Sequence, residues 1–246
     1  MAPAGIGDSV EGLHAVAAAL TAGRVIALRV EAHRLKSDAY AALVDAARSA
    51  SVSVDVVDDV RPHATTSAPQ GVIAVCRPIA TTTLQEAVAA TEPAALLVFD
   101  HLEDPRNVGA AVRSAVAAGF RAIVVPRRRT AALGAAAFKA AAGTFEQVVV
   151  AEVGSIPEAL KRLDQLGVWR VGLDASGDRS LFGLDLFTGP VALVVGAEGS
   201  GLSRLTAERC DALVAIPHAG PAESLNASVA ISLAVFEVAR MRGWVT

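Results

Sequence analysis

A glycine-rich turn with a single acid and a helix start with two polar side chains are the groups best suited to chemistry in this 246-residue chain. The turn at 196–201 contains Glu198 and directly follows the apolar run 191–195. Ser224 and Asn226 come after a second apolar run, in the first turn of a long amphipathic segment. Two strands that end in polar, glycine-bearing loops build a ligand crevice at the carboxyl edge of an α/β sheet. These residues by themselves therefore predict a small-molecule site and no particular reaction.

Further upstream, a polar motif follows the apolar run LLVFD at 96–100. It reads D-P-x-N-x-G-x-x-x-R and consists of Asp104, Pro105, Asn107, Gly109 and Arg113. The turn and helix start described above read G-x-E-G-x-G-L, then I-P-x-x-G, then S-L-N-x-S. In this order and at this spacing, the three patterns resemble motifs one to three of the SpoU/TrmH family of SPOUT RNA 2′-O-ribose methyltransferases.

The resemblance implies an enzyme that methylates the ribose 2′-oxygen of RNA with S-adenosylmethionine as the methyl donor. It also implies a homodimer joined through the C-terminal domain, with the active site at the dimer interface, and a deep C-terminal trefoil knot. Knots are nearly absent from proteins in general, so the knot rests on the resemblance alone. The branch that methylates guanosine in 23S rRNA is the most similar one, because its members carry a comparable N-terminal domain.

Catalytic roles follow from the resemblance for a small polar set: Arg113, Asn107, Glu198, Ser224 and Asn226. Arg113 would act on the 2′-hydroxyl, either as proton acceptor or by positioning the ribose; a guanidinium normally stays protonated. Asn107 would hold Arg113 or the ribose, and Glu198 would pair with Arg113. Helix capping is the structural alternative for Asn107, and for Ser224 it carries equal weight.

The cofactor pocket is expected to form from the glycine turn, the I-P loop and the last helix start: Gly196, Ala197, Glu198, Gly199, Gly201, Ile216, His218, Ser224, Leu225 and Asn226. Glycine allows a close approach of backbone to ligand, although turn formation alone would also account for these glycines. His218 stands where the family usually has methionine, and we expect it to face solvent.

Phosphate contacts are expected from arginines near the first motif and after the apolar run 122–126: Arg106, Arg113, Arg127, Arg128 and Arg129. The formal net charge of −3 argues mildly against a nucleic-acid partner, since dedicated binders usually carry a basic excess. An arginine run after a strand is also commonly a solvated loop, so the resemblance decides in favour of RNA.

Composition narrows the protein class. Apolar residues make up 53% of the chain and aromatic residues only 4%, which suits an α/β protein with an aliphatic core. No apolar run is long enough to span a bilayer, and the N-terminus lacks the pattern of a signal peptide. Two distant cysteines and five scattered histidines indicate a cytoplasmic protein without a metal site. A dinucleotide-binding dehydrogenase is excluded because no G-x-G-x-x-G follows the first strand of either half.

Short apolar strands alternate with helices from residue 96 onward, which predicts a mostly parallel sheet covered on both faces. Helices are expected at 12–23, 37–50, 108–118, 134–142 and 156–167, with a last helix after 224. We expect three domain regions: an L30e-like RNA-binding domain at 1–79, a linker at 80–93 and a SPOUT catalytic domain at 94–246. The L30e resemblance rests on G-x-H-A-V near the start and on Gln70–Ala74, with Pro69 where family members often have histidine.

Two alternatives to an rRNA enzyme remain open. One is a tRNA-directed or antibiotic-resistance methyltransferase of the same family; the absence of long basic extensions weakly disfavours a tRNA enzyme. The other is a catalytically inactive RNA-binding relative, against which the intact set of polar motif residues argues. The sequence does not identify the nucleotide that is modified.

Overall fold

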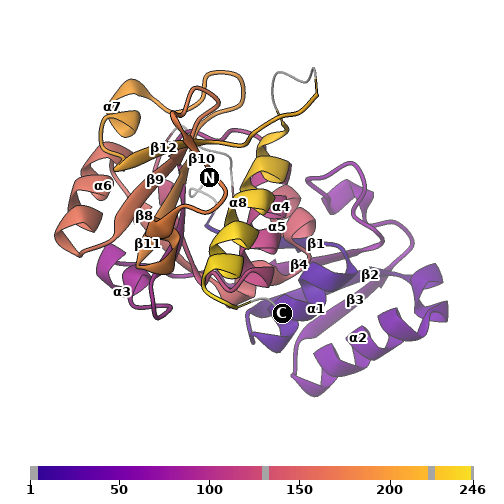
Figure 1. Cartoon of the computed structure of the whole chain (residues 1–246). Coiled ribbons are helices and arrows are strands. Elements are labelled where there is room, and N and C mark those ends of the chain that lie inside the picture. Colours follow the sequence, from indigo (N-terminus) through magenta and orange to yellow (C-terminus); the bar gives the residue numbers. More distant parts are fainter. Residues whose placement is uncertain (1–4, 129–132, 221–224, 245–246) are drawn as a thin grey trace. The chain divides into compact units, whose positions relative to one another are not determined.

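The computed structural model describes residues 5–128, 133–220 and 225–244 of a chain that folds as two compact units (Figure 1). Unit 1 comprises Met1–Ala80 and Ala132–Gln147, and unit 2 comprises Thr81–Ala131 and Val148–Thr246. A segment from the middle of the chain therefore belongs to the first unit.

Unit 1 is built on a four-stranded sheet in the order β1-β4-β2-β3. The strands are β1 (Ser9–Glu11), β2 (Val25–Glu31), β3 (Ser53–Val57) and β4 (Val72–Cys76). The helices are α1 (Leu13–Thr21), α2 (Asp38–Ser49) and α5 (Ala135–Ala141), with 3-10 turns η1 (Ala32–Lys36), η2 (Arg61–His63) and η3 (Thr144–Gln147). Strand β4 is antiparallel to β1 and β2, whereas β3 runs parallel to β2.

The helix expected at 134–142 is present as α5, but it packs on β1 and α1 of unit 1 instead of joining the parallel sheet. Its Phe138 stacks on Phe145 with 4.4 Å between the ring centroids, and both rings are buried. Glu146 forms a largely buried ion pair with Arg24. These apolar and ionic contacts hold the segment in unit 1, and they depend on partners that strand and helix patterns do not reveal.

Unit 2 contains an eight-stranded sheet in the order β10-β12-β9-β11-β6-β7-β8-β5, and every neighbouring pair is parallel. The strands are β5 (Thr81–Thr82), β6 (Ala95–Phe99), β7 (Ala122–Pro126), β8 (Val149–Val153), β9 (Trp169–Leu173), β10 (Arg179–Ser180), β11 (Val191–Val195) and β12 (Ala212–Ala215). The helices are α3 (Leu84–Val88), α4 (Pro105–Ala117), α6 (Ile156–Gln165), α7 (Arg204–Ala207) and α8 (Ala227–Met241), with the 3-10 turn η4 (Asp185–Thr188). The expected α/β class with a parallel sheet is confirmed.

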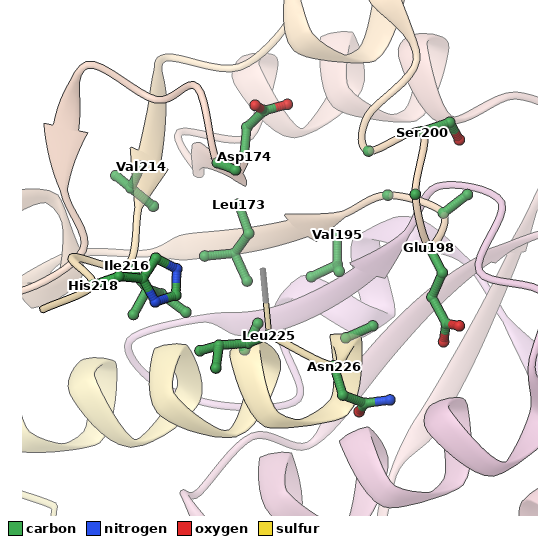
Figure 2. Close-up of a pocket in the computed structure, with 17 residues that line it drawn as sticks. Leu173, Asp174, Val195, Glu198, Ser200, Val214, Ile216, His218, Leu225 and Asn226 are labelled. Carbon is green, nitrogen blue, oxygen red and sulfur yellow. The ribbon is translucent and has the colours of Figure 1, made fainter. Parts of the chain in front are cut away.

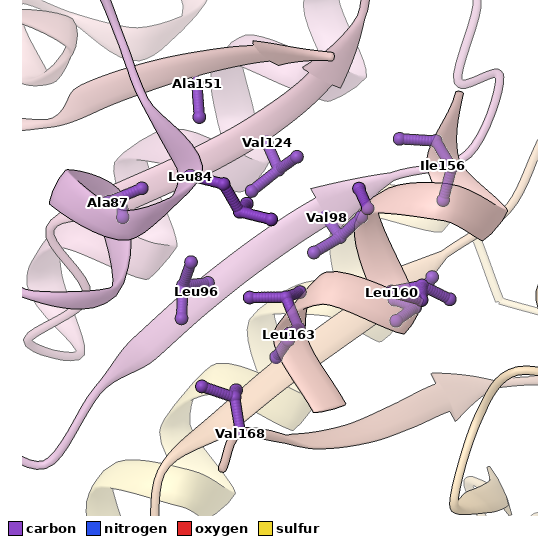
Figure 3. Close-up of a cluster of buried hydrophobic side chains, with 14 of the residues drawn as sticks. Leu84, Ala87, Leu96, Val98, Val124, Ala151, Ile156, Leu160, Leu163 and Val168 are labelled. Atoms are coloured by element: carbon purple, nitrogen blue, oxygen red, sulfur yellow. The ribbon is translucent and has the colours of Figure 1, made fainter. Parts of the chain in front are cut away.

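Both faces of this sheet are covered, because every residue of β6, β7 and β11 is buried. On one face, α3 and α6 pack over an aliphatic cluster that includes Leu96, Val98, Leu160 and Leu163 (Figure 3). On the other face α8 packs on α4 and β11. The Ser232 hydroxyl donates to the Ser114 hydroxyl across the two helices at 2.8 Å, which fixes α4 relative to the start of α8.

Residues 80–93, expected as a linker, contain regular structure that belongs to unit 2. Strand β5 pairs with β8, and α3 begins with a capping box in which Thr83 accepts from the Glu86 amide and Glu86 accepts from the Thr83 amide. This reciprocal capping satisfies two helix-end donors and allows a helix in a segment poor in branched aliphatic residues.

Candidate active site

A cavity of about 610 Å³ opens at the carboxyl ends of the neighbouring strands β9, β11 and β12 (Figure 2). Leu173, Val195 and Val214, from the ends of these strands, give it apolar walls. The loop 196–201 and the first turn of α8 complete the lining. Parallel sheets place their ligand crevices at this edge, and the volume is that of a pocket for a small ligand.

Nine of the ten residues predicted for a cofactor pocket line this cavity: Gly196, Ala197, Glu198, Gly199, Gly201, Ile216, His218, Leu225 and Asn226. The tenth, Ser224, lies outside the described residues. The motifs did not indicate eight further lining residues: Leu173, Asp174, Ala175, Val195, Ser200, Val214, Ala227 and Ala230. Several of these sit at the ends of predicted strands, so the rule that ligands bind at that edge was the signal available to find them.

The loop 196–201 folds back on itself. Ala197 and Gly201 exchange two backbone hydrogen bonds, of 3.0 and 2.9 Å. A Cβ atom at Gly196 would stand 2.1 Å from the carbonyl carbon and oxygen of Gly201, so only glycine permits this close approach. Gly199 differs: its φ of +82° is the left-handed conformation that favours glycine, but a Cβ there would meet nothing within 4 Å.

The start of α4 connects the first motif to this loop. Asp104 is the N-cap and its Oδ1 accepts from the Arg106 amide at 2.8 Å, so Asn107 does not cap the helix. Asn107 Nδ2 instead donates a hydrogen bond to Glu198 Oε1 of the glycine loop. The expected pairing of Glu198 with Arg113 is therefore replaced by a bond to Asn107, which lies nearer the helix start.

Arg113 is exposed on α4 and does not line the cavity. Among the described residues, no hydrogen bond or ion pair involves its guanidinium. Arg113 lies six residues after Asn107, so the two side chains leave the helix on different faces, whereas Arg106, seven residues before Arg113, shares its face. The two arginines thus form an exposed cationic stripe along α4.

The predicted phosphate-binding arginines divide into paired and free groups. Arg106 forms an ion pair with Asp104 at 3.2 Å; the side-chain hydrogen bond between them lowers the pKa of Asp104 and raises the pKa of Arg106. Arg127 and Arg128 are exposed directly after β7, at the same carboxyl edge as the cavity. Arg129 lies outside the described residues.

Two residues at the cavity wall have identifiable surroundings. His218 is exposed although it lines the cavity, which agrees with the expectation that it faces solvent. Asn226 caps α8: its Oδ1 accepts from the amide and the hydroxyl of Ser228 at 2.9 and 2.6 Å. The start of α8 is thereby fixed against the cavity, and a catalytic role for Asn226 stays a prediction.

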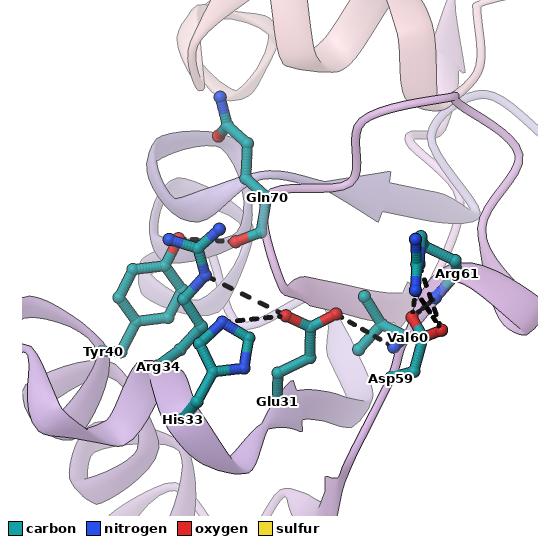
Figure 4. A network of polar contacts seen from close by, with 8 residues as sticks. All are labelled: Glu31, His33, Arg34, Tyr40, Asp59, Val60, Arg61 and Gln70. Carbon is teal, nitrogen blue, oxygen red and sulfur yellow. Dashed lines mark hydrogen bonds and ion pairs between the residues drawn. The ribbon is translucent and has the colours of Figure 1, made fainter.

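Unit 1 carries a network of polar side chains around the buried Glu31 carboxylate (Figure 4). The buried Glu31 carboxylate accepts from the Val60 amide at 3.2 Å, and its Oε2 lies 3.5 Å from His33 Nε2 and 4.0 Å from Arg34 Nε. The Arg34 guanidinium lies over the Tyr40 ring, 5.7 Å from its centroid. Glu31 thus connects the 3-10 turn η1 with the residue that precedes η2.

The described residues offer no group of three or more histidine, cysteine, aspartate or glutamate side chains placed to hold a metal ion. In that same part of the chain, no helix is long and apolar enough to cross a membrane. Burial raises the pKa of the Cys76 thiol to about 11 and that of Cys210 to about 12. Both thiols therefore stay protonated at neutral pH and are poor nucleophiles.

Comparison with known families identifies the family to which the unit that holds this cavity belongs. The family model of the SpoU rRNA methylases matches residues 94–236. The chain belongs to the SpoU rRNA methylase family. A second model, described as RNA 2′-O ribose methyltransferase substrate binding, matches residues 9–82, which lie in unit 1 apart from Thr81 and Thr82.

Curated relatives within the SpoU family carry both specific and general names. An uncharacterized tRNA/rRNA methyltransferase of Mycolicibacterium smegmatis is 48% identical over 159 residues, 65% of this chain and 50% of the relative. A 23S rRNA (guanosine-2′-O-)-methyltransferase RlmB of Photorhabdus laumondii is 43% identical over 70% of this chain and 72% of its own length. The chain thus spans about half the length of the first relatives it matches.

Solved SpoU structures match nearly the whole chain. The methyltransferase AviRb from Streptomyces viridochromogenes superposes with a TM-score of 0.80 at 26% identity, covering 96% of this chain and 90% of AviRb. An AdoMet-bound rRNA methyltransferase from Sinorhizobium meliloti gives a TM-score of 0.76 at 25% identity, covering 94% and 86%. The SpoU architecture therefore extends over both units.

Proposed function

We propose that this chain is an S-adenosylmethionine-dependent methyltransferase that methylates a ribose 2′-oxygen in ribosomal RNA, specifically 23S rRNA. The observation that carries the proposal is the cavity at the carboxyl edge of β9, β11 and β12, bounded by the glycine loop and joined to α4 through Asn107 and Glu198. Two relatives named as 23S rRNA (guanosine-2′-O-)-methyltransferases favour this substrate over tRNA.

The cavity suits the proposed cofactor in size and in chemistry. Its volume of about 610 Å³ lies within the usual range for small-ligand pockets. Leu173, Val195 and Leu225 offer an apolar surface for an adenine ring, and Gly196 leaves no room for a side chain where the loop backbone closes. SpoU relatives with the cofactor bound, AviRb among them, support this assignment.

When bound, S-adenosylmethionine supplies an electrophilic methyl group on a positively charged sulfur. Methyl transfer to the ribose 2′-oxygen would leave S-adenosylhomocysteine, and the hydroxyl proton would pass to water. We assign Asn107, whose amide donates a hydrogen bond to Glu198, to holding the ribose beside the cavity. A guanidinium normally stays protonated, so we assign Arg113 to binding the adjacent phosphate and orienting the hydroxyl.

RNA contacts are proposed for both units. In unit 2 the guanidinium of Arg113, which has no partner among the described residues, and the exposed Arg127 and Arg128 offer sites for phosphates. In unit 1 the Arg34 guanidinium is held by Glu31 and by the Tyr40 ring before any RNA binds, which limits the entropy lost on binding. A ribosomal RNA substrate also favours the cytoplasm as the place of action.

A homodimer through α8 and a trefoil knot in unit 2 complete the proposal. Phe182, Val229, Leu233 and Phe236 are 38–48% exposed and line an apolar groove, with Glu237 and Arg240 at its edge. Val229, Leu233 and Phe236 repeat at helical spacing along α8, and a second copy of the same face is the simplest cover for such a stripe. The knot rests on the family to which the chain belongs.

The dimer is tested by light scattering on the full chain at micromolar concentration. Phe236→Glu should convert a dimer into a monomer, because it places a charge in the apolar groove. Leu205→Glu changes a leucine on α7 that is 53% exposed, compared with 42% for Phe236, and it should leave the dimer intact. A wild-type monomer, or a Phe236→Glu dimer, would contradict the proposal.

The activity itself is tested with purified protein, labelled S-adenosylmethionine and 23S rRNA from cells that lack this protein. We expect label on one ribose 2′-oxygen, found as an alkali-resistant dinucleotide. Label only on tRNA would redirect the substrate assignment. Cofactor binding without transfer to any RNA would support the catalytically inactive RNA-binding relative.

A further inference from the structure

Asp174 is the first residue after β9 and lies outside all three sequence motifs, yet it lines the cavity (Figure 2). Its backbone amide donates to the Val214 carbonyl at 3.0 Å, so its position between β9 and β12 is fixed by the sheet. The side chain is half-buried. Asp174 and Glu198 are the two carboxylates among the lining residues that the structure describes.

The two oxygens of the Asp174 carboxylate differ in their partners. Oδ1 accepts from the amide and the hydroxyl of Ser176, at 2.8 and 2.6 Å, and so fixes the turn that follows β9. Oδ2 accepts no hydrogen bond from any described residue. A Cβ atom built on Gly201 would lie 3.4 Å from Oδ2, so this oxygen faces the glycine loop where that loop carries no side chain.

Two other side-chain oxygens of the cavity already accept hydrogen bonds. Glu198 Oε1 takes the Asn107 amide, and Asn226 Oδ1 takes both donors of Ser228. Asp174 Oδ2 is a charged acceptor to which no described residue donates, and the bonds to Oδ1 hold its carboxylate in a fixed orientation. In other α/β folds, an acidic residue near the carboxyl edge of the sheet binds the ribose hydroxyls of a nucleotide.

We propose that Asp174 is a specificity-determining residue of the cavity, and that its Oδ2 accepts a hydrogen bond from a ribose hydroxyl of the adenosyl cofactor. This inference rests on the proposed function. A hydrogen bond to a charged acceptor gives stronger discrimination than a neutral one. The cavity would thereby reject ligands that carry the adenine and the sulfur but lack the ribose hydroxyl.

The test is a ligand–variant cycle measured by titration calorimetry on the full chain. The ligands are S-adenosylhomocysteine and its 2′-deoxy and 3′-deoxy analogues, and the variants are wild type and Asp174→Ala. For wild type, we expect one deoxy analogue to bind on the order of 10- to 100-fold more weakly. Asp174→Ala should bind S-adenosylhomocysteine more weakly than wild type by a similar factor. The variant should bind that deoxy analogue almost as strongly as it binds S-adenosylhomocysteine.

Ser176→Ala serves as the matched control, because it removes a hydroxyl that binds Oδ1 and leaves Oδ2 in place. It should keep the wild-type preference for the hydroxylated ligand. If the binding free energies lost through Asp174→Ala and through the missing hydroxyl were additive, the inference would be overturned. Asp174 would then act only in forming the turn. The inference would equally be overturned if the variant's loss vanished with an analogue lacking the amino group, because Asp174 would then bind the ammonium. If wild type failed to bind S-adenosylhomocysteine at all, the proposed function would fail with it.

Discussion

The cavity and the exposed face of α4 belong to the same unit but differ in how far their polar groups are already hydrogen-bonded. Around the cavity, the glycine loop is closed by paired backbone bonds and the start of α8 is capped by Asn226. On α4, Arg113 is exposed and has no partner among the described residues. The bond between Asn107 and Glu198 connects the two regions at their common edge.

This difference indicates that the cavity and the exposed face of α4 have separate functions. A pocket whose backbone is already closed can bind a small ligand without ordering anything further, which preserves affinity. An unpaired guanidinium on a helix surface costs little in water and gains its strength when a phosphate displaces that water. We therefore expect changes around the cavity to act on cofactor affinity, and changes on α4 to act on methyl transfer.

The largest effect on affinity is expected from Gly196→Ala. Its new Cβ would clash with the Gly201 carbonyl group at 2.1 Å and open the loop. Affinity for S-adenosylhomocysteine should fall by about 100-fold or more, equivalent to about 2.8 kcal/mol. The matched control is Gly167→Ala, which lies outside the cavity lining and meets nothing within 4 Å; it should change affinity by less than about threefold, although its positive φ costs about 1 kcal/mol of stability. Equal losses in titration calorimetry would show that the loop closure does not shape the pocket.

An intermediate effect is expected where the two regions meet. Asn107→Ala and Glu198→Gln should each slow single-turnover methyl transfer by about tenfold, because both weaken the same hydrogen bond. The double variant should be little slower than either single one, with a coupling energy of about 1 kcal/mol. If the rate losses of the two single variants multiplied in the double variant, the two side chains would act independently. The observed bond would then not position the substrate.

The smallest effect is expected from Arg128→Ala, which removes one exposed guanidinium after β7. RNA affinity should fall a few-fold and the slope of log affinity against log salt should decrease by about one. The rate at saturating RNA should not change. Arg162→Ala on α6 also removes an exposed arginine and should alter neither quantity; an equal effect of both variants would remove the residues after β7 from the RNA-binding surface.

Sequence reasoning predicted the parallel sheet well, because its strands are continuous apolar runs and need no knowledge of distant contacts. The lining of the cavity could also be named, since the glycine loop and the start of α8 stand in recognisable motifs. Asp174 was missed because it belongs to no motif and reaches the cavity only through the pairing of β9 with β11 and β12.

Contacts between residues far apart in the sequence account for the other differences. The packing of α5 in unit 1 depends on the Arg24–Glu146 pair and on the stacking of Phe138 on Phe145, which no local pattern encodes. Glu198 was expected to pair with Arg113, but Asn107 on the first turn of α4 is nearer to the loop. From the sequence, a charge pair between Glu198 and Arg113 is the simpler expectation, but in the structure Glu198 bonds to Asn107 instead.

The central claim is that Arg113 serves the transfer step while the cavity alone binds the cofactor. Its most direct test measures Arg113→Ala twice, by single-turnover methyl transfer to 23S rRNA and by titration with S-adenosylhomocysteine, with Arg113→Lys beside it. We predict that Arg113→Ala abolishes transfer with cofactor affinity within about twofold of wild type, and that lysine restores little because it lacks the planar fork. A fully active Arg113→Ala, or one that loses cofactor binding and transfer together, would contradict this division of duties.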